Sequence, residues 1–197
     1  MERIRGFSLV EALVVVAIAG MILAIGAPEL FGVRRKVNLE RLARHVKQDA
    51  MVAKISALTE GRNVGLVFSE DRGRWYWVMV ADGNGNGVSR RDYLAGVDRA
   101  IGPRVWLEFL AAGAGCGVPE AWAVPDPSGS GLLPADGLRA GRSNIISFTP
   151  RGTATPSSVY FHDGHSRMLV IRVHGGLGRI RVLEWRRGWP EWKEVQF

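Results

Sequence analysis

A long apolar run near the start of the chain most constrains what it can fold into. Residues 7–27 form a stretch of 21 residues in which Glu11 is the single charged side chain. A helix of that length spans about 30 Å, which is the thickness of the hydrocarbon core of a bilayer. The run therefore predicts a membrane-spanning helix. A carboxylate inside it costs roughly 2–4 kcal/mol, so Glu11 needs a function and a cation supplied by another molecule.

Two simpler interpretations of this segment remain open. A secretory signal peptide would use the basic leader before residue 7 and a cleavage site at residues 24–26. The acidic Glu11 and the length of the apolar run both argue against it. A plain signal anchor accounts for the length, but it explains neither Glu11 nor the Gly6-Phe7 junction.

The junction between the leader and the apolar run matches a known signal. The segment Gly6-Phe7-Ser8-Leu9-Val10-Glu11 resembles the class III signal of type IV pilins and pseudopilins, with glutamate as the fifth mature residue. The resemblance implies that a prepilin peptidase removes residues 1–6 by cutting between Gly6 and Phe7, and that Phe7 is then N-methylated. It also implies that Glu11 meets the N-terminal amine of a neighbouring subunit when helices bundle into a filament. A buried ion pair of this kind can fix the register of assembly.

The helix is predicted to resume beyond the apolar run, over residues 29–60. Pro28 sits where pilins of this kind carry a proline, and its ring either loosens the helix or merely ends the spanning segment, 7–28. Residues 29–60 carry an amphipathic stripe with spacings of three and four. The stripe consists of Leu39, Leu42, Val46, Ala50, Ala53 and Ala57. Gly61 is predicted to end the helix.

After Gly61 the pattern changes to short runs of β-branched and aromatic residues between turn signals. The predicted strands are 64–68, 75–80, 105–109, 145–148, 159–161, 168–173 and 179–183. Residues 61–197 are thus predicted to form an antiparallel β-sheet head, and the whole chain an α+β, pilin-like fold with the helix packed on the sheet. The Gly/Pro-rich segment 111–142 is predicted to be a surface loop, either a partner-facing part of a pilin or a tolerated insertion.

The sequence from Asp82 to Gly87 offers a candidate calcium site. Asp82, Asn84 and Asn86 alternate like the first ligands of an EF-hand loop, but Tyr93 stands where the bidentate glutamate belongs. A turn built on Asp-Gly and Asn-Gly is the better interpretation, so we expect no cofactor, with calcium as the alternative. The GspH/FimT branch of the pilin superfamily is similar in carrying an Asp/Asn/Gly-rich loop after an aromatic strand.

Basic charge is concentrated in the last third of the chain. The net charge is +7, and +6 of it falls from Arg139 onward. Within this part, Gly178-Arg179-Ile180-Arg181 resembles the Gly-Arg-x-Arg element of FimT minor pilins linked to DNA uptake. In a strand, Arg179 and Arg181 would share a face about 7 Å apart, close to the phosphate repeat of a nucleic acid. The candidate DNA-binding residues are Gly178, Arg179, Arg181, Arg186 and Arg187. A solvated strand face is the alternative.

No catalytic pattern accompanies these features, and we predict that the chain is not an enzyme. The sequence has no Ser/His/Asp arrangement, no phosphate loop and no paired carboxylates, and Cys116 is its single cysteine. The absence of a second cysteine excludes an intramolecular disulfide and favours the minor pilin or pseudopilin side of the superfamily.

The resemblance as a whole implies a GspH/FimT-type minor pilin or pseudopilin. Such a subunit is anchored by one pass in the bacterial inner membrane, with a periplasmic head, and assembles into a type II secretion pseudopilus or a type IV pilus. The expected partners are the prepilin peptidase, other pilins or pseudopilins, the inner membrane, and DNA or a secreted substrate. DNA binding during natural transformation, through the arginine-rich C-terminal face, is the alternative function.

Overall fold

The computed structural model describes residues 8–129, 131–135, 137–140 and 143–196, and over residues 24–31 it describes the helical backbone alone. Gly6, Phe7 and the rest of the predicted leader therefore lie outside the described residues, as does the side chain of Pro28. The chain divides into two compact units, Met1–Arg34 and Arg35–Phe197.

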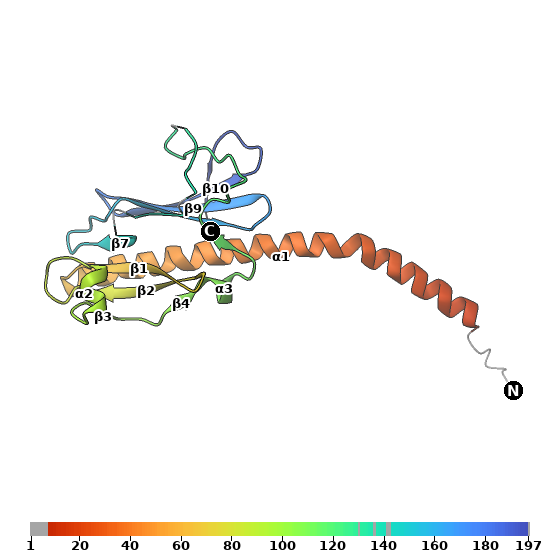
Figure 1. The fold of residues 1–197 in the computed structure, drawn as a ribbon, viewed down its shortest axis with the longest axis horizontal. Coiled ribbons are helices and arrows are strands. Elements are labelled where there is room, and N and C mark those ends of the chain that lie inside the picture. Colours follow the sequence, from red (N-terminus) through yellow and green to blue (C-terminus); the bar gives the residue numbers. More distant parts are fainter. Residues whose placement is uncertain (1–7, 130, 136, 141–142, 197) are drawn as a thin grey trace. The chain divides into compact units, whose positions relative to one another are not determined.

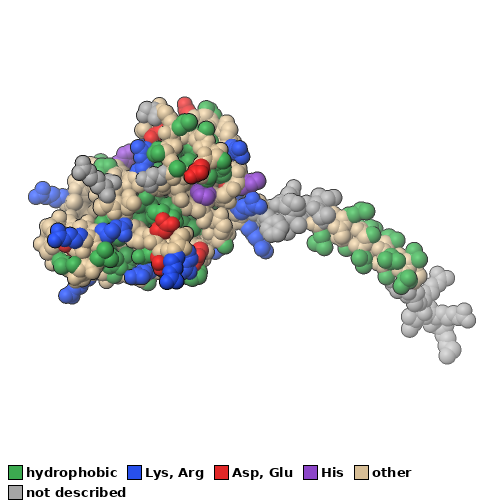
Figure 2. Space-filling model, viewed as in Figure 1, with side chains coloured by type: hydrophobic (Ala, Val, Ile, Leu, Met, Phe, Trp, Pro, Cys, Tyr) green, Lys and Arg blue, Asp and Glu red, His purple; other side chains and the backbone are tan. Residues whose placement is uncertain are grey.

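Apart from Ser8, the described part of the first unit belongs to helix α1, Leu9–Glu60. Its large apolar side chains between residues 9 and 23 are exposed (Figure 2), with Leu9 at 80% and Leu23 at 69%. Within the described residues, however, no helix combines the length and the apolarity that a membrane crossing requires. The membrane-spanning role of residues 7–28 therefore stays a proposal.

In the second unit, α1 turns its predicted apolar stripe toward the core. The fully buried members of the stripe are Leu39, Leu42, Val46, Ala50, Ala53 and Ala57. The helix ends at Glu60, and Gly61 follows with a φ of 67°, a left-handed conformation that favours glycine after a helix. The spacing of apolar residues thus correctly predicted the buried face of α1.

The strands that follow α1 form two antiparallel sheets among the described residues (Figure 1). The first sheet contains β1 Val64–Asp71, β2 Arg74–Ala81, β3 Arg99–Ala100, β4 Val105–Trp106 and β7 Ile145–Phe148. The second contains β5 Gly115–Cys116, β6 Leu138–Ala140, β8 Ser157–His162, β9 Arg167–His174, β10 Arg179–Arg186 and β11 Lys193–Val195. Two short helices are α2, Arg90–Leu94, and α3, Leu107–Leu110. A helix followed by antiparallel sheets confirms the predicted α+β, pilin-like arrangement.

The pairing order places one hairpin inside each sheet, β1–β2 in the first and β9–β10 in the second. The first sheet runs β3-β2-β1-β7, with β4 also paired to β2. The second runs β11-β10-β9-β8-β5, with β6 also paired to β8. The β9–β10 hairpin, which carries most of the candidate arginines, therefore lies inside the second sheet rather than at its edge.

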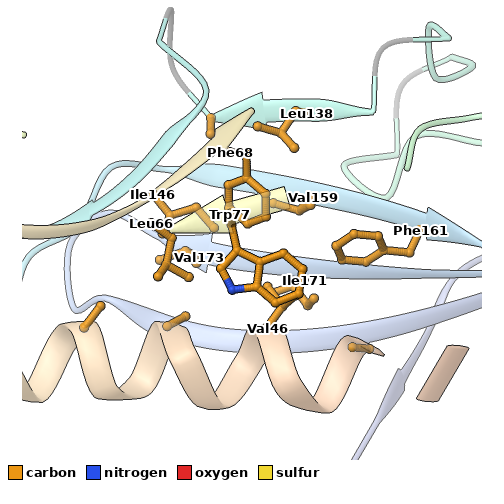
Figure 3. Packing of buried hydrophobic residues seen from close by; sticks show 14 of the residues in the cluster. Val46, Leu66, Phe68, Trp77, Leu138, Ile146, Val159, Phe161, Ile171 and Val173 are labelled. Carbon is orange, nitrogen blue, oxygen red and sulfur yellow. The ribbon is translucent and has the colours of Figure 1, made fainter. Parts of the chain in front are cut away.

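Trp77 on β2 lies in the middle of a core shared by α1 and both sheets. Figure 3 shows its ring directed toward Val46 of α1, with Phe68 of the first sheet and Ile171 of the second nearby. Trp77 is 2% exposed, and its Nε1 donates to Asp49 Oδ2 of α1 at 2.7 Å. The helix and the two sheets thus bury their apolar faces against one another in a single cluster.

The middle of the chain differs from the prediction in two places. The strand predicted over 105–109 stops at Trp106, because Leu107 begins α3, so the second half of that prediction is wrong. In the segment 111–142, predicted as a surface loop, β5 and β6 both pair with β8.

This segment also builds a second, smaller core on the second sheet. The core contains the buried residues Val118, Val124, Leu133, Tyr160, Met168, Val170 and Trp185. A Cβ on Gly137 would lie 2.3 Å from the Gly117 Cα, so the segment closes through a backbone contact that only glycine permits. Part of the segment is therefore packed structure rather than free loop.

Candidate functional site

The described N-terminus begins with a reciprocal pair of hydrogen bonds between Ser8 and Glu11. The Ser8 N–H donates to Glu11 Oε2 at 3.0 Å, and the Glu11 N–H donates to Ser8 Oγ at 3.2 Å. This is a capping box, in which two otherwise unsatisfied N–H groups of the first helical turn gain partners. The acidic residue of the prepilin-like signal therefore has a second, local role in starting α1.

The turn between β9 and β10 holds the first candidate DNA-binding residue. Gly178 has a φ of 54°, and a Cβ there would lie 2.8 Å from the Gly152 carbonyl oxygen, so this position favours glycine. Lys54 of α1 donates from Nζ to the Leu177 carbonyl at 2.8 Å and to the Gly178 carbonyl at 3.3 Å. The helix therefore holds this turn immediately before Arg179.

The four candidate arginines do not share one free surface. Arg179 is exposed, whereas Arg181 is half-buried and its Nη1 lies 3.7 Å from Oε2 of Glu194 on β11. Arg186 pairs with a buried glutamate, and strand alternation places it on the other face of the sheet. Arg187 follows the end of β10 and is exposed. Arg179, Arg186 and Arg187 are therefore the exposed members of the set, and of these Arg186 is paired with a carboxylate.

The candidate calcium ligands form a turn held by hydrogen bonds within it and to Asn63, Asp92 and Asp98. Both carboxylate oxygens of Asp82 accept hydrogen bonds, from Asn63 Nδ2 and from the N–H groups of Asn84, Gly85 and Gly87. Burial would raise the pKa of Asp82, but these hydrogen bonds hold it below its ordinary value. The Asn86 N–H donates to Asn84 Oδ1 at 3.1 Å. No group of three or more His, Cys, Asp or Glu side chains suited to a metal ion occurs among the residues described.

Arg167, at the start of β9, joins the second sheet to α1. Its Nε donates to Glu184 Oε1 at 2.8 Å, and its Nη2 lies 2.6 Å from the same oxygen. Nη2 also lies 3.3 Å from Glu40 Oε1 on α1, and Arg186 Nε donates to Glu184 Oε1 at 2.7 Å. Glu184 is 6% exposed, so its charge depends on these two arginines. Removing either partner of such a buried pair leaves a charge without compensation.

Acid is expected to weaken this network. Burial would raise the pKa of Glu184, but Arg186 and Arg167 hold it below its ordinary value. With a lowered pKa, the stabilising contribution is present above the unfolded-state pKa, about 4.3, and is lost as pH falls through the folded-state value. We expect the urea midpoint of the full-length chain to fall between about pH 5 and about pH 3, and Glu184→Gln to reduce that pH dependence. Glu191→Gln, at an exposed carboxylate, is the control. If the urea midpoint changed with pH equally in the wild type and in Glu184→Gln, the result would contradict the role of this network.

Two arginines on the second sheet did not stand out from the sequence. Arg139 lies on β6, and Arg172 lies on β9 directly opposite Arg181. A hairpin turn at residues 175–178 would have predicted the pairing of Arg172 with Arg181, because the turn fixes the register of its strands. No local pattern connects Arg139 to either of them.

The family comparison agrees with the geometry of the N-terminus. Residues 1–27 match the model of the prokaryotic N-terminal methylation motif. No curated protein and no solved structure matches the chain. A signal of this class implies a membrane-anchored structural subunit that a prepilin peptidase processes and that assembles with other pilins. The chain thus carries the class III prepilin signal, and its N-terminal helix followed by antiparallel sheets is consistent with a type IV pilin-like protein.

Proposed function

We propose that this chain is a minor pilin or pseudopilin of the GspH/FimT type. Its role is to assemble into a type II secretion pseudopilus or a type IV pilus, for protein secretion or pilus biogenesis. The observation that carries the proposal is the methylation motif at residues 1–27, which contains the Gly6-Phe7 junction and Glu11. The proposed action is structural and recognitional, and it requires neither a catalytic residue nor a cofactor.

In this proposal the parts of the chain have separate tasks. Residues 1–6 are the leader, residues 7–28 anchor the precursor in the inner membrane and later join the filament, and residues 29–60 support the periplasmic head, 61–197. The exposed apolar side chains between residues 9 and 23 support the second of these assignments. Such a surface is unfavourable in water and requires lipid or neighbouring helices.

The processing of the N-terminus provides the first test. We expect the mature protein, isolated from its native host, to begin at Phe7 with one methyl group on its amine. Mass spectrometry of the N-terminal peptide measures both changes. Co-expression with an active and an inactive prepilin peptidase supplies the control. An unprocessed chain beginning at Met1 in the presence of the active peptidase would contradict the proposal, and cleavage at residues 24–26 would favour a signal peptide.

A second candidate function is DNA binding during natural transformation. It is supported by the exposed Arg179 at the β9–β10 turn and by the exposed Arg187. The carboxylates near Arg181 and Arg186 count against it, because they neutralise part of the positive charge.

A salt series tests this candidate with the full-length chain in detergent. If the chain binds DNA, we expect a dissociation constant of about 1–100 µM for a fluorescent duplex at low salt, weakening as salt rises. The Arg179→Ala, Arg181→Ala variant should then lose most of the binding. Arg72→Ala, Arg99→Ala removes the same charge from exposed positions at the β1–β2 turn and on β3, and is the matched control. Absence of binding at low salt would leave the filament role alone.

A further inference from the structure

Three arginines lie in one row across four neighbouring strands of the second sheet. Arg139 on β6 is opposite Ser158 on β8, Ser158 is opposite Arg172 on β9, and Arg172 is opposite Arg181 on β10. Directly opposite residues in antiparallel strands point to the same face, and neighbouring strands are about 4.8 Å apart. We call these four residues the arginine row. The sequence separation of its members hides it from any local motif.

The arginine row lies on the face of the second sheet that is turned away from α1. The neighbouring positions on the same strands, such as Ile171 and Val182, point to the opposite face and belong to the core that contains α1. The row therefore shares its face with the smaller core around Trp185. This face is partly covered, because Arg172 Nη1 donates to the Pro127 carbonyl at 3.1 Å.

Two hollows adjoin the row and share Arg172 and Asp126 in their walls. The first, of about 320 Å³, is lined by Arg139, Ser158, Tyr160 and His174 in addition to the shared pair. The second, of about 440 Å³, includes Arg181 and Trp192 in its wall. Volumes of this order are at the lower end of those found for small-molecule sites.

The carboxylates around the row are Asp126, Glu194 and, in the wall of the second hollow, Glu191, and none of them forms a described ion pair with Arg172. Asp126 already accepts from Ser128 Oγ through Oδ1 at 2.6 Å and from Arg139 Nη1 through Oδ2 at 2.7 Å. Arg172 has no ion pair with any described residue, and it donates to the neutral Pro127 carbonyl. Arg181 lies 3.7 Å from its carboxylate, and its buried Nε has no hydrogen-bond partner in the part of the chain described. Positive charge and N–H donors therefore remain uncompensated in the centre of the row.

We propose that the arginine row binds a small oxyanion, a phosphate or a polycarboxylate, with Arg172 at the centre of the site. Guanidinium groups hold such oxygens in pairs of parallel hydrogen bonds, and Ser158, whose side chain also interacts with Tyr160, lies between two of them as a neutral hydroxyl. The recessed walls and the volume of the hollows favour a small ligand over a polymer. This inference does not depend on the filament role, and its failure would leave that role untouched.

A structural role for the row is the competing account. Arg139 and Arg172 both bond to residues 126–127, so the arginines could serve to hold this segment on the sheet. The two accounts differ in what Ser158 does. Its hydroxyl is a donor for a bound oxyanion, whereas Ser158→Ala leaves every bond from the arginines to the segment in place.

Calorimetric titration of the full-length chain in detergent decides between them. The probes are inorganic pyrophosphate and citrate at constant ionic strength. Comparing them distinguishes a phosphate ligand from a polycarboxylate ligand. We expect saturable binding of one of them, weakened at least tenfold by Arg172→Gln and about threefold by Ser158→Ala. Arg99→Gln removes an equal charge from the first sheet and should leave the affinity unchanged. The melting temperature of each variant without ligand reports any loss of folding.

Each outcome of the titration supports or overturns the proposal. Saturable binding that depends on Arg172 and Ser158 but not on Arg99 supports it, whichever probe binds. Absence of saturable binding by the wild type overturns it, as does an equal loss in Arg99→Gln, which would indicate unspecific charge attraction. If Arg172→Gln unfolds the chain, Ser158→Ala decides the matter alone, and an unchanged affinity in that variant overturns the proposal.

Discussion

We expect Glu11→Ala to leave leader removal intact but to reduce incorporation of the chain into filaments by about 100-fold or more. In the proposed assembly the Glu11 carboxylate meets the amine of a neighbouring Phe7 away from water. Removing one partner of a buried ion pair costs about 3–5 kcal/mol, and every 1.4 kcal/mol is a tenfold change in equilibrium. The measurement is the amount of this subunit in purified filaments relative to the amount of processed protein in the membrane fraction.

The capping box supplies a discriminating control for this prediction. Glu11 also accepts the Ser8 N–H, so alanine removes a helix cap as well as a charge. Glutamine keeps the capping hydrogen bond, because Glu and Gln both serve at this position, but it carries no charge. We therefore expect Glu11→Gln to fail in assembly almost as severely as Glu11→Ala. Normal incorporation of the glutamine variant would show that the cap, and not the ion pair, is what assembly requires.

Trp77→Ala is expected to lower the free energy of unfolding of the full-length chain by about 3–5 kcal/mol. The side chain is 2% exposed, lies 5.9 Å from the Phe68 ring between centroids, and donates its N–H to Asp49. Its removal leaves a large cavity between α1 and β2 and an unpaired acceptor. Proteins of this size have a total stability of about 5–15 kcal/mol, so the change removes a large share of it.

Urea unfolding followed by circular dichroism measures the Trp77 effect. The matched control is Trp106→Ala, the same chemical deletion at a half-buried ring whose centroid lies 4.8 Å from that of the Tyr76 ring. We expect this control to lose only about 1 kcal/mol. Equal losses in the two variants would mean that Trp77 does not occupy the centre of the shared core.

The elements with regular periodicity could be predicted from the sequence. The stripe from Leu39 to Ala57 repeats at three and four residues because one face of α1 meets the core, and each member of it is fully buried. The hairpin strands β9 and β10 were predicted because their apolar residues alternate or run continuously between glycine turns. Ile180 packs against the core as that alternation requires.

Elements that depend on partners distant in sequence could not be predicted. The run at 105–109 has a pattern that suits a strand or a helix. It leaves the sheet after Trp106, whose last partner is Tyr76 on β2. In the segment 111–142, isolated apolar residues such as Val124 become buried only because the second sheet supplies a surface for them. A single sequence contains no local signal for such packing.

The same distinction applies to the candidate sites. The prepilin signal lies within a few consecutive residues, so Glu11 could be recognised directly from its distance to Gly6. The arginine row joins Arg139, Arg172 and Arg181 from three strands, and only the register of those strands brings them together. The partners of Arg181 and Arg186 were missed for the same reason, because Glu194 and Glu184 act through strand pairing and side-chain reach.

The single cluster that joins α1 to both sheets has a mechanical consequence. A pull on the second half of the helix is resisted at once by the apolar side chains of both sheets and by Lys54, which holds the turn before β10. Each sheet also has its own polar attachment to α1, through Trp77 and Asp49 for the first sheet and through Arg167 and Glu40 for the second. Force applied along α1 therefore loads the whole head as one body, and the helix can be extracted only when the head comes apart.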